Sequence, residues 1–276
     1  MPLTVRLLGG LGNQLFQVAT GYGLAKKCKT EFFLFHDEFD GCGQGNPPSK
    51  YSMIYKNFHY KHRSDVAAVE YKERSWHAYD VGSEIDPTIQ NIELRGYYQS
   101  EEHFREYKSE ICAWILPKAG AAAYLRTQTD LASRYPELFE THDFCFIGVR
   151  RGDYLRNPHV HNPCGMTYYR QAMEACPAPK YYIASDDMAW CRANFVGPQY
   201  VFLDIADDLA LMYLGSLFPK YIISNSSYHW WISYLSAYTA PRIIAPDKWI
   251  FRLGRDAYNS IYREEMIVLE RPVETS

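Results

Sequence analysis

The chain has 276 residues, a formal net charge of −3 at pH 7, 47% hydrophobic residues and 22% charged residues. This composition is globular and excludes a disordered chain, and the charge gives no sign of a nucleic-acid surface. No apolar run approaches the ~20 residues of a membrane-spanning helix, and no signal peptide opens the chain. The seven cysteines form no CxxC pair, which favours reduced thiols. We therefore expect a soluble cytoplasmic protein without an integral membrane segment, able to act at a membrane surface.

The chain begins with a predicted strand over residues 3–8, a glycine-rich turn and a predicted helix over about 15–27. The turn reads GGLGNQ and contains Gly10, Gly12 and Asn13. A strand, a glycine-rich turn and a helix N-terminus together can present backbone N–H groups to an anion. The dinucleotide-binding fingerprint is not met, because Leu15 stands at the third glycine position. The turn therefore predicts close backbone approach, either to a ligand or within a tight turn that binds nothing.

The rest of the first half is less regular. Strands are predicted over 31–35 and 89–94, and a helix over 101–114 with Ser100 as its N-cap. The stretch 51–86 has no firm period, so no element is predicted there. We place the boundary between two domains at residues 137/138, which gives domains 1–137 and 138–276.

The second half alternates strands with helices. The apolar run 144–149 predicts a strand buried on both faces, and it leads directly into Arg150 and Arg151. Further strands are predicted over 180–184, 200–203, 221–223 and 242–245. This alternation indicates a parallel sheet with right-handed crossovers. The segments that follow these strands would share one carboxyl edge, where open α/β sheets bind ligands: 150–151, 185–187, 204–208 and 224–227.

The residue types at this edge suit a ligand that carries phosphate. Arg150 offers a planar guanidinium fork for phosphate oxygens, and Ser226 and Ser227 offer donors at a helix N-terminus. Asp208 could accept two N–H bonds from a guanine edge. Each has a plainer alternative: the arginine in a surface ion pair, Ser226 as a helix cap, and Asp208 as a favourable charge at a helix start.

A metal ion is a further possible ligand at the same edge. Asp186–Asp187 and Asp207–Asp208 could hold Mg²⁺ on a nucleotide. Arginine can neutralise a diphosphate without a metal, so we expect no metal requirement. His159 and His161 are not joined by an evident third ligand, which argues against zinc.

Several motifs together resemble one known family. In chain order they read GGLGNQLFQ (9–17), GYYQSEEHF (96–104), VRRGDY (149–154), SDD (185–187), DLALM (208–212), ISNSSYHWWISYL (223–235) and IIAPDKWIF (243–251). They span nearly the whole chain and resemble glycosyltransferase family 11, the inverting alpha-1,2-fucosyltransferases that use GDP-fucose. Each motif alone is unspecific, whereas their combination and order are specific.

The resemblance implies a fold and a set of site residues. The expected fold is α/β of GT-B type, with two Rossmann-like lobes whose parallel sheets face a cleft, the acceptor mainly on the first and GDP-fucose mainly on the second. By similarity, Arg150 holds the β-phosphate and Asn13 reaches the donor from the first lobe, as the two expected catalytic residues. The expected donor-binding set is Gly10, Gly12, Arg150, Arg151, Asp208, Asn225, Ser226 and Ser227.

One position departs from the family pattern. The family's usual His-x-Arg-Arg-x-Asp has Gly148 at the histidine position of this chain. In related fucosyltransferases that histidine contacts the guanine base, so recognition of the base is altered here or moved to Asp208. The departure leaves open whether the donor is GDP-fucose or another GDP-sugar.

The expected reaction is a single displacement at the anomeric carbon by a glycan hydroxyl, O2 of a terminal galactoside, with GDP leaving. A general base should assist the hydroxyl. Asp37, Glu101 and His103 are candidates for this base or for acceptor contacts, because they follow strand ends of the first lobe. The expected partners are GDP-fucose and a galactose-containing glycan, without a cofactor.

Two other classes of function stay open from the sequence. The glycine turn alone is compatible with a Rossmann oxidoreductase. A non-catalytic module that binds nucleotide-sugar or glycan would keep the same fold and lose turnover. The sequence does not indicate an oligomeric state.

Overall fold

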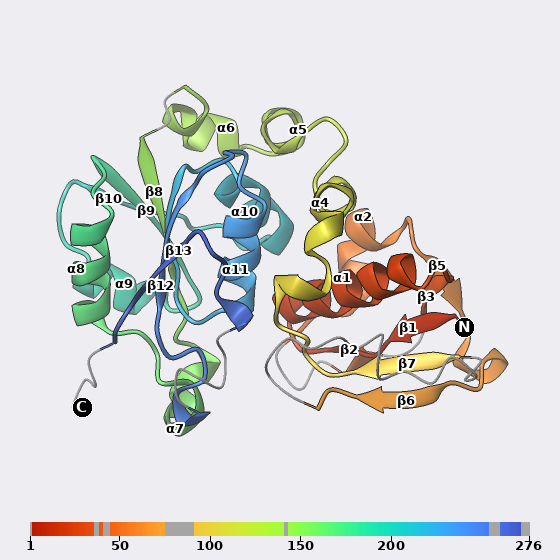
Figure 1. The fold of residues 1–276 in the computed structure, drawn as a ribbon. Helices are drawn as coiled ribbons and strands as arrows, with labels where there is room; N and C mark the ends of the chain where they lie inside the picture. The colour runs from red at the N-terminus through yellow and green to blue at the C-terminus, as the bar shows by residue number, and fades with distance from the viewer. Residues whose placement is uncertain are drawn as a thin grey trace. The chain divides into compact units, whose positions relative to one another are not determined.

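The computed structural model describes residues 2–35, 39–40, 45–74, 91–140, 143–253 and 260–271. The chain divides into two compact units, Met1–Ile115 and Leu116–Ser276, and each is built on its own parallel sheet (Figure 1). The predicted boundary at 137/138 lies later than this division. The segment between belongs with the second unit because α5 (Ala121–Gln128) packs on α10 (Asp208–Gly215), with the rings of Tyr124 and Tyr213 5.4 Å apart.

Unit 1 contains a five-stranded sheet in the order β5-β3-β1-β7-β6. Its strands are β1 (Leu3–Val5), β3 (Phe32–Phe35), β5 (His59–Lys61), β6 (Val69–Lys72) and β7 (Ile92–Arg95), and β2 (Leu7–Leu8) pairs separately with β4 (Phe39–Asp40). The three inner strands are almost wholly buried, whereas the edge strands β5 and β6 are partly exposed. This explains why no strand was predicted at 59–61 and 69–72: edge strands with mixed polarity lack a clear hydrophobic period. Residues 75–86 of the stretch 51–86 lie outside the described residues.

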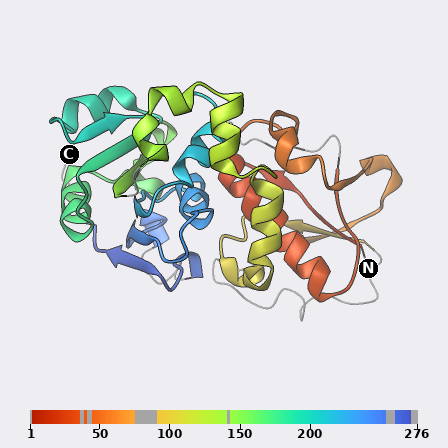
Figure 2. The same cartoon turned by 90° about the horizontal axis from the view of Figure 1, so that it is seen from above.

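The helices of unit 1 differ from the prediction at two places. Those within the described residues are α1 (Leu11–Lys27), α2 (Ser52–Tyr55) and α4 (Lys108–Ile115), with short 3-10 turns η1 (Pro48–Tyr51), η2 (Arg63–Asp65), η3 (Glu101–His103) and η4 (Arg105–Tyr107). Helix α1 begins four residues before the predicted start, so most of the glycine turn is already helical. The predicted helix 101–114 is two 3-10 turns followed by α4, because Phe104 has a non-helical backbone between them. Viewed from above, α1 and α4 lie side by side over the strands (Figure 2).

Unit 2 contains a six-stranded parallel sheet in the order β10-β9-β8-β11-β12-β13. Its strands are β8 (Phe144–Val149), β9 (Lys180–Ser185), β10 (Tyr200–Phe202), β11 (Lys220–Ile222), β12 (Arg242–Pro246) and β13 (Met266–Leu269). Its remaining helical segments are α6 (Leu131–Arg134), α7 (Pro158–His161), α8 (Met166–Ala175), α9 (Met188–Asn194), α11 (Ser227–Tyr234), η5 (Pro136–Phe139), η6 (Asp153–Arg156) and η7 (Phe251–Leu253). The five predicted strands are present, and β13 lies where the sequence predicted only a tail.

Strand β8 is buried along its whole length and is central to the sheet. Helices α8 and α9 lie on one face of the sheet and α10 and α11 on the other (Figure 1). Because side chains alternate along a strand, Cys145, Ile147 and Val149 enter the cluster with α8. Phe146 turns to the opposite face, where its ring lies 6.1 Å from His229 of α11. A strand covered on both faces accounts for the unbroken apolar run seen in the sequence.

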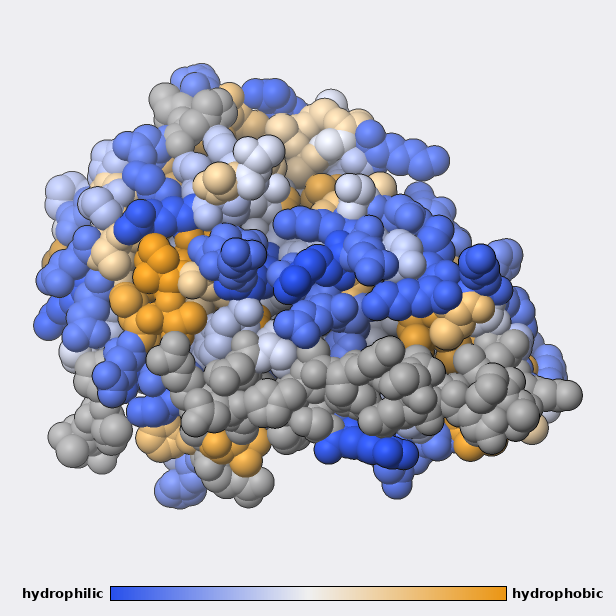
Figure 3. All heavy atoms as spheres, viewed as in Figure 1, coloured by the Kyte–Doolittle hydropathy of each residue, from blue (hydrophilic) through white to orange (hydrophobic). Residues whose placement is uncertain are grey.

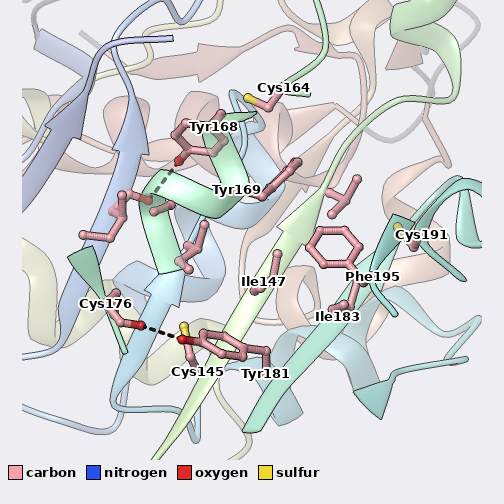
Figure 4. Packing of buried hydrophobic residues seen from close by; sticks show 14 residues of the cluster. Cys145, Ile147, Cys164, Tyr168, Tyr169, Cys176, Tyr181, Ile183, Cys191 and Phe195 are labelled. Atoms are coloured by element: carbon pink, nitrogen blue, oxygen red, sulfur yellow. Dashed lines mark hydrogen bonds between the residues drawn. The ribbon is translucent and has the colours of Figure 1, made fainter. Parts of the chain in front are cut away.

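The core on the side of the sheet covered by α8 and α9 contains four buried cysteines. Tyr168 and Tyr169 of α8 pack over the strand beside Ile147 (Figure 4). The buried thiols are Cys145, Cys164, Cys176 and Cys191, and none of the six described cysteines forms a disulfide.

The face of the molecule in Figure 3 is mostly hydrophilic, with separate hydrophobic patches. None of the helices in the described part of the chain has the length and hydropathy to cross a membrane.

Candidate functional site

The candidate site in unit 2 is the carboxyl edge of the six-stranded sheet. The register pairs Val149 with Ser185 and Ile147 with Ile222, so β8, β9 and β11 end at the same level. The segment after β11 is tied to β8 by the bond from the Ser224 N–H to the Gly148 carbonyl, 3.1 Å. The structure therefore brings together the residues that follow these three strands, as the alternating pattern predicted.

Arg150 lies between two carboxylates at this edge. Its terminal nitrogens are 2.5 Å from Asp153 Oδ1 and 3.1 Å from Asp186 Oδ2, and its guanidinium lies 5.3 Å from the ring centroid of Tyr154. The side chain keeps 30% of its surface exposed. A guanidinium has five N–H donors, more than two ion pairs require. Arg150 is thus held in a fixed place while part of it stays accessible to an anion.

The backbone and the side chain of Arg151 are both held by neighbouring residues. Its N–H donates to Asp186 Oδ1 (2.8 Å), its Nε donates to Asp187 Oδ2 (3.2 Å), and its guanidinium lies 4.0 Å from the ring centroid of Trp190. Asp187 also caps α9 through the N–H of Trp190. These bonds join the ends of β8 and β9, so the side chain of Arg151 stabilises the edge on which Arg150 stands.

The structure gives a physical reason for glycine at position 148. A Cβ on Gly148 would stand 2.5 Å from the imidazole of His229, which occupies that space from α11. His229 is buried, and its Nδ1 lies 2.9 Å from the hydroxyl oxygen of Ser224. Burial and the nearby charge of Arg150 lower the pKa of His229 to about 3. The imidazole is therefore neutral at physiological pH and lies next to the arginine.

The turn after β11 leads into α11 and contains three predicted donor contacts. Ser226 occupies the N-cap position, yet its hydroxyl accepts no N–H from the helix. This differs from the cap alternative, in which the Ser226 hydroxyl accepts an N–H of the helix. Ser227 is the first helical residue and is half-buried.

Asn225 is a structural link in the same turn. Its side-chain amide donates to the carbonyls of His161 (2.8 Å) and Trp249 (3.0 Å), and the residue is 1% exposed. Its own carbonyl accepts the hydroxyl of Tyr154 (2.9 Å). Asn225 thereby joins the segments after β8, β11 and β12 at one edge.

Asp208 lies at the start of α10, after the outer strand β10. Asp207, not Asp208, caps the helix, accepting the N–H of Ala210 at 2.8 Å. The carbonyl of Asp208 accepts the hydroxyl of Tyr228 on α11. Asp208 is thus linked to the helix that Ser226 begins, and its side chain is half-buried.

The glycine turn of unit 1 is tighter than predicted. Gly10 is the N-cap of α1 with extended backbone, and Gly12 and Asn13 form the first turn of the helix. Gly9 has φ +72°, a left-handed value that favours glycine. Part of the predicted close approach is made within the chain, because a side chain at Gly45 would collide with the Gly9 carbonyl.

Asn13 is oriented by a neighbour from another strand end. Gln99, which follows β7, donates from Nε2 to Asn13 Oδ1 at 2.8 Å. Because Oδ1 accepts the bond from Gln99, the NH₂ group of the Asn13 amide points away from Gln99 and is the donor of this side chain.

The three candidate bases of the sequence analysis have different places. Asp37 lies outside the described residues. Glu101 is 8% exposed and 3.4 Å from the guanidinium of Arg105. His103 packs edge-on against the ring of Tyr98, and burial together with Lys27 lowers its pKa to about 4. Glu101 is therefore engaged in an ion pair, and His103 is packed against an aromatic ring.

Two residues of interest were missed by the sequence analysis. His229 sits within a quoted motif, but only the fold shows that its ring fills the space beside Gly148. Glu73 follows β6, in the stretch without a period, and its carboxylate accepts the N–H groups of Tyr97 (2.7 Å) and Tyr98 (2.9 Å). Burial raises the pKa of Glu73 to about 7. No local pattern around position 73 could have indicated this.

Among the described residues, no group of three or more His, Cys, Asp or Glu side chains is arranged to hold a metal ion.

Known proteins share both sequence and fold with this chain. Residues 48–269 match the family described as Glycosyl transferase family 11. The O-antigen biosynthesis glycosyltransferase WbnK of Escherichia coli is 26% identical over 88% of this chain and 93% of its own length. An alpha-1,2-colitosyltransferase of the same species is 24% identical over 91% and 93%. A galactoside 2-alpha-L-fucosyltransferase of Bos taurus is 27% identical over 69% of this chain and 51% of its own length.

One solved structure shows the likeness in three dimensions. NodZ alpha-1,6-fucosyltransferase from Bradyrhizobium, co-crystallised with GDP, superposes with a TM-score of 0.50 at 16% identity, over 90% of this chain and 95% of its own. At this identity the likeness concerns the fold alone.

Proposed function

Because the chain belongs to glycosyl transferase family 11, we propose that it moves L-fucose from GDP-fucose to O2 of a terminal galactoside, with inversion and without a metal. The expected α/β fold of GT-B type is confirmed by the two parallel-sheet units and by the fucosyltransferase structure they resemble. A glycosyltransferase of this family replaces the oxidoreductase alternative. The reaction is proposed for the cytoplasm, on small or lipid-linked glycans.

The observation that carries the proposal is Arg150 next to the N-terminus of α11. Fixed positive charge and the N-terminus of a helix are the two features that bind a diphosphate and stabilise it as a leaving group. Arg150 follows β8, and Ser226 and Ser227 follow the adjacent strand β11. In the proposed complex Arg150 binds the β-phosphate and the 226–227 turn binds the diphosphate oxygens.

The carboxylates around Arg150 add a condition to this proposal. Asp153, Asp186 and Asp187 carry one more charge than Arg150 and Arg151 can balance. A diphosphate therefore binds by replacing part of the Arg150 ion pairs or by using the remaining guanidinium N–H groups. Release of Asp153 or Asp186 on binding would make affinity depend on ionic strength.

The proposed donor-binding set also has members in unit 1. Asn13, held by Gln99, offers an amide NH₂ group, and the backbone at Gly10 and Gly12 offers close approach at the start of α1. Arg151, Asp208 and Asn225 remain in the proposed donor-binding set, the first and last mainly by holding the edge in shape.

A second donor is the alternative that one relative favours. The alpha-1,2-colitosyltransferase of Escherichia coli aligns with 91% of this chain, so a different deoxysugar on GDP is the leading competitor to fucose. The glycine at position 148 bears on this choice, because the imidazole there comes from α11 and not from β8.

The test is release of GDP from GDP-fucose with lactose or N-acetyllactosamine, in the presence of EDTA, for the natural protein and Arg150→Ala. We expect acceptor-dependent release that survives EDTA and falls by about 10²–10³-fold in the variant, the range for removing one charge-stabilising donor. Arg242→Ala is the matched control, because Arg242 begins β12 at the opposite edge of the sheet, where its guanidinium donates to the Ala175 carbonyl.

Other results would change the proposal. Release from GDP-colitose and not from GDP-fucose would reassign the donor. GDP binding without transfer of any sugar would favour the non-catalytic binding module. Loss of activity in EDTA, restored by Mg²⁺, would contradict metal independence.

A further inference from the structure

We infer that Glu73 is the catalytic base of unit 1, taking the proton from the acceptor hydroxyl. The inference rests on the proposed function, since a base is needed only if a hydroxyl attacks the donor sugar. Glu73 lies outside all of the sequence motifs named above.

Glu73 lies at the carboxyl edge of the unit 1 sheet, the edge that also carries Asn13. Strands β6, β7 and β1 are neighbours in the sheet, and Glu73, Gln99 and Asn13 follow β6, β7 and β2 along the chain. A continuous set of bonds connects them: Asn13 to Gln99 by side chains, and the Tyr97–Tyr98 backbone to Glu73. The carboxylate is therefore placed where open α/β sheets bind ligands.

The local backbone is shaped around this carboxylate. Tyr98 has φ +48°, a left-handed value that is an outlier for a bulky residue, and its ring is buried. This conformation directs two successive N–H groups at the two oxygens of Glu73. A side chain at Gly96 would collide with the same carboxylate, whose Oε2 lies 2.6 Å from where a Cβ would stand. Strain of this kind persists where the surroundings fix a functional group.

Two backbone bonds fix the position of the carboxylate and leave lone pairs for a proton. A carboxylate has about four acceptor sites, of which these N–H groups use two. Burial raises the pKa of Glu73 to about 7, against the opposing effect of the Tyr97 and Tyr98 N–H groups. A base with a pKa near the working pH is the most effective, because it is ionised and still holds a proton strongly.

The charged groups around Glu73 do not neutralise it in the described part of the chain. On β6 and β7, Lys72 and Arg95 are both paired with Glu70. Arg74 has its guanidinium over the ring of Tyr71, 5.6 Å from the centroid. On η3, His103 packs against Tyr98, and its lowered pKa of about 4 makes it neutral.

The other described candidates are less suited to this role. Glu101 is paired with Arg105, so its carboxylate is already engaged in an ion pair. His103 has a pKa of about 4, so its neutral imidazole is a poor proton acceptor at neutral pH.

The proposed step balances without any further reactant. An electron pair of the acceptor oxygen forms the new bond to C1 of the donor sugar, and the bond from C1 to the β-phosphate oxygen breaks. The bonding electrons leave with GDP, whose added charge Arg150 stabilises. The hydroxyl proton moves to a carboxylate oxygen of Glu73 and is later lost to water.

The experiment compares Glu73→Gln with Glu70→Gln, a glutamate three residues earlier on β6 whose carboxylate is ion-paired. We expect Glu73→Gln to lower the transfer rate by about 10²–10⁴-fold and to leave GDP affinity unchanged. In the natural protein kcat/KM should rise with pH through about 7 and level off above it, and this limb should vanish in the variant. Glu73→Ala should regain activity when formate is added.

The possible failures are distinguishable. If the natural protein transfers sugar and Glu73→Gln retains both the rate and the acid limb, Glu73 is not the base while the transferase assignment stands. If GDP affinity falls in proportion to the rate and formate restores nothing, Glu73 only holds the 96–99 segment, and the inference is wrong. If the natural protein transfers no sugar from any GDP-sugar, both the proposed function and this inference fail.

Discussion

At the scale of single residues, Gly148 and His229 depend on each other. The glycine leaves a space on β8 beside Arg150, and the imidazole fills it from α11. An imidazole therefore lies beside position 148, and it comes from α11.

We expect Gly148→Ala to destabilise unit 2 by about 1–3 kcal/mol, because the added Cβ stands 2.5 Å from the imidazole in a packed core. Urea unfolding followed by tryptophan fluorescence measures the change. In a His229→Ser background the same Gly148→Ala substitution should cost much less, since the ring is gone. Equal costs in the two backgrounds would show that the ring does not restrict position 148.

At the scale of elements, the turn after β11 organises the edge. Asn225 bonds the carbonyls of His161 and Trp249, so one amide joins segments that follow three different strands. The shape of the proposed diphosphate site depends on this link, although Asn225 itself is buried.

We expect Asn225→Ala to lower stability by about 1–3 kcal/mol, the cost of leaving buried carbonyls without a donor. It should also weaken GDP binding, measured by calorimetry, because the 224–227 turn loses its support. Asn194→Ala is a suitable control, since the Asn194 amide donates to the Trp190 carbonyl at the end of α9. Unchanged GDP affinity in Asn225→Ala would contradict the supporting role.

The sequence predicts elements well where one physical signal dominates. The apolar run of β8 predicted its own burial and the placing of Arg150, because a strand covered on both faces has no polar positions. Prediction from the sequence failed at β5 and β6, because their half-exposed residues follow no hydrophobic period. It also failed at 101–107, where short 3-10 turns replace the predicted helix. Glu73 and His229 were out of reach because their roles arise from contacts between distant segments.

At the scale of the whole molecule, the two units respond differently to acid. The pKa of His229 in unit 2 is lowered to about 3, and that of His103 in unit 1 to about 4. Below pH 6.5 these histidines bind protons in the unfolded chain but stay neutral in the folded protein. The free energy of unfolding therefore falls as the pH drops, by up to about 1.4 kcal/mol per pH unit for each histidine. Glu73 has the opposite sign: its pKa of about 7 means that its contribution is full below 4.5 and is lost as pH rises through 7.

We therefore expect unit 2 to lose stability before unit 1 as pH falls from 6.5 to 4.5, because Glu73 offsets His103 only in unit 1. Urea midpoints across this range, followed by tryptophan fluorescence, measure the effect. Four of the six tryptophans lie in unit 2: Trp190, Trp230, Trp231 and Trp249. His229→Asn should flatten the pH dependence of that signal. A slope unaltered by this substitution would assign the acid sensitivity to other groups.

The distribution of thiols gives the two units separate chemical reporters. The four buried sulfurs all belong to the α8 side of the unit 2 core, while the described cysteines of unit 1, Cys28 and Cys112, are exposed and partly exposed. An alkylating reagent added to the native protein reacts first with Cys28 and Cys112. It reacts with the four buried cysteines of unit 2 only while the core around them is open. The mass of the labelled chain over time therefore records how often the proposed donor unit opens, without any engineered probe.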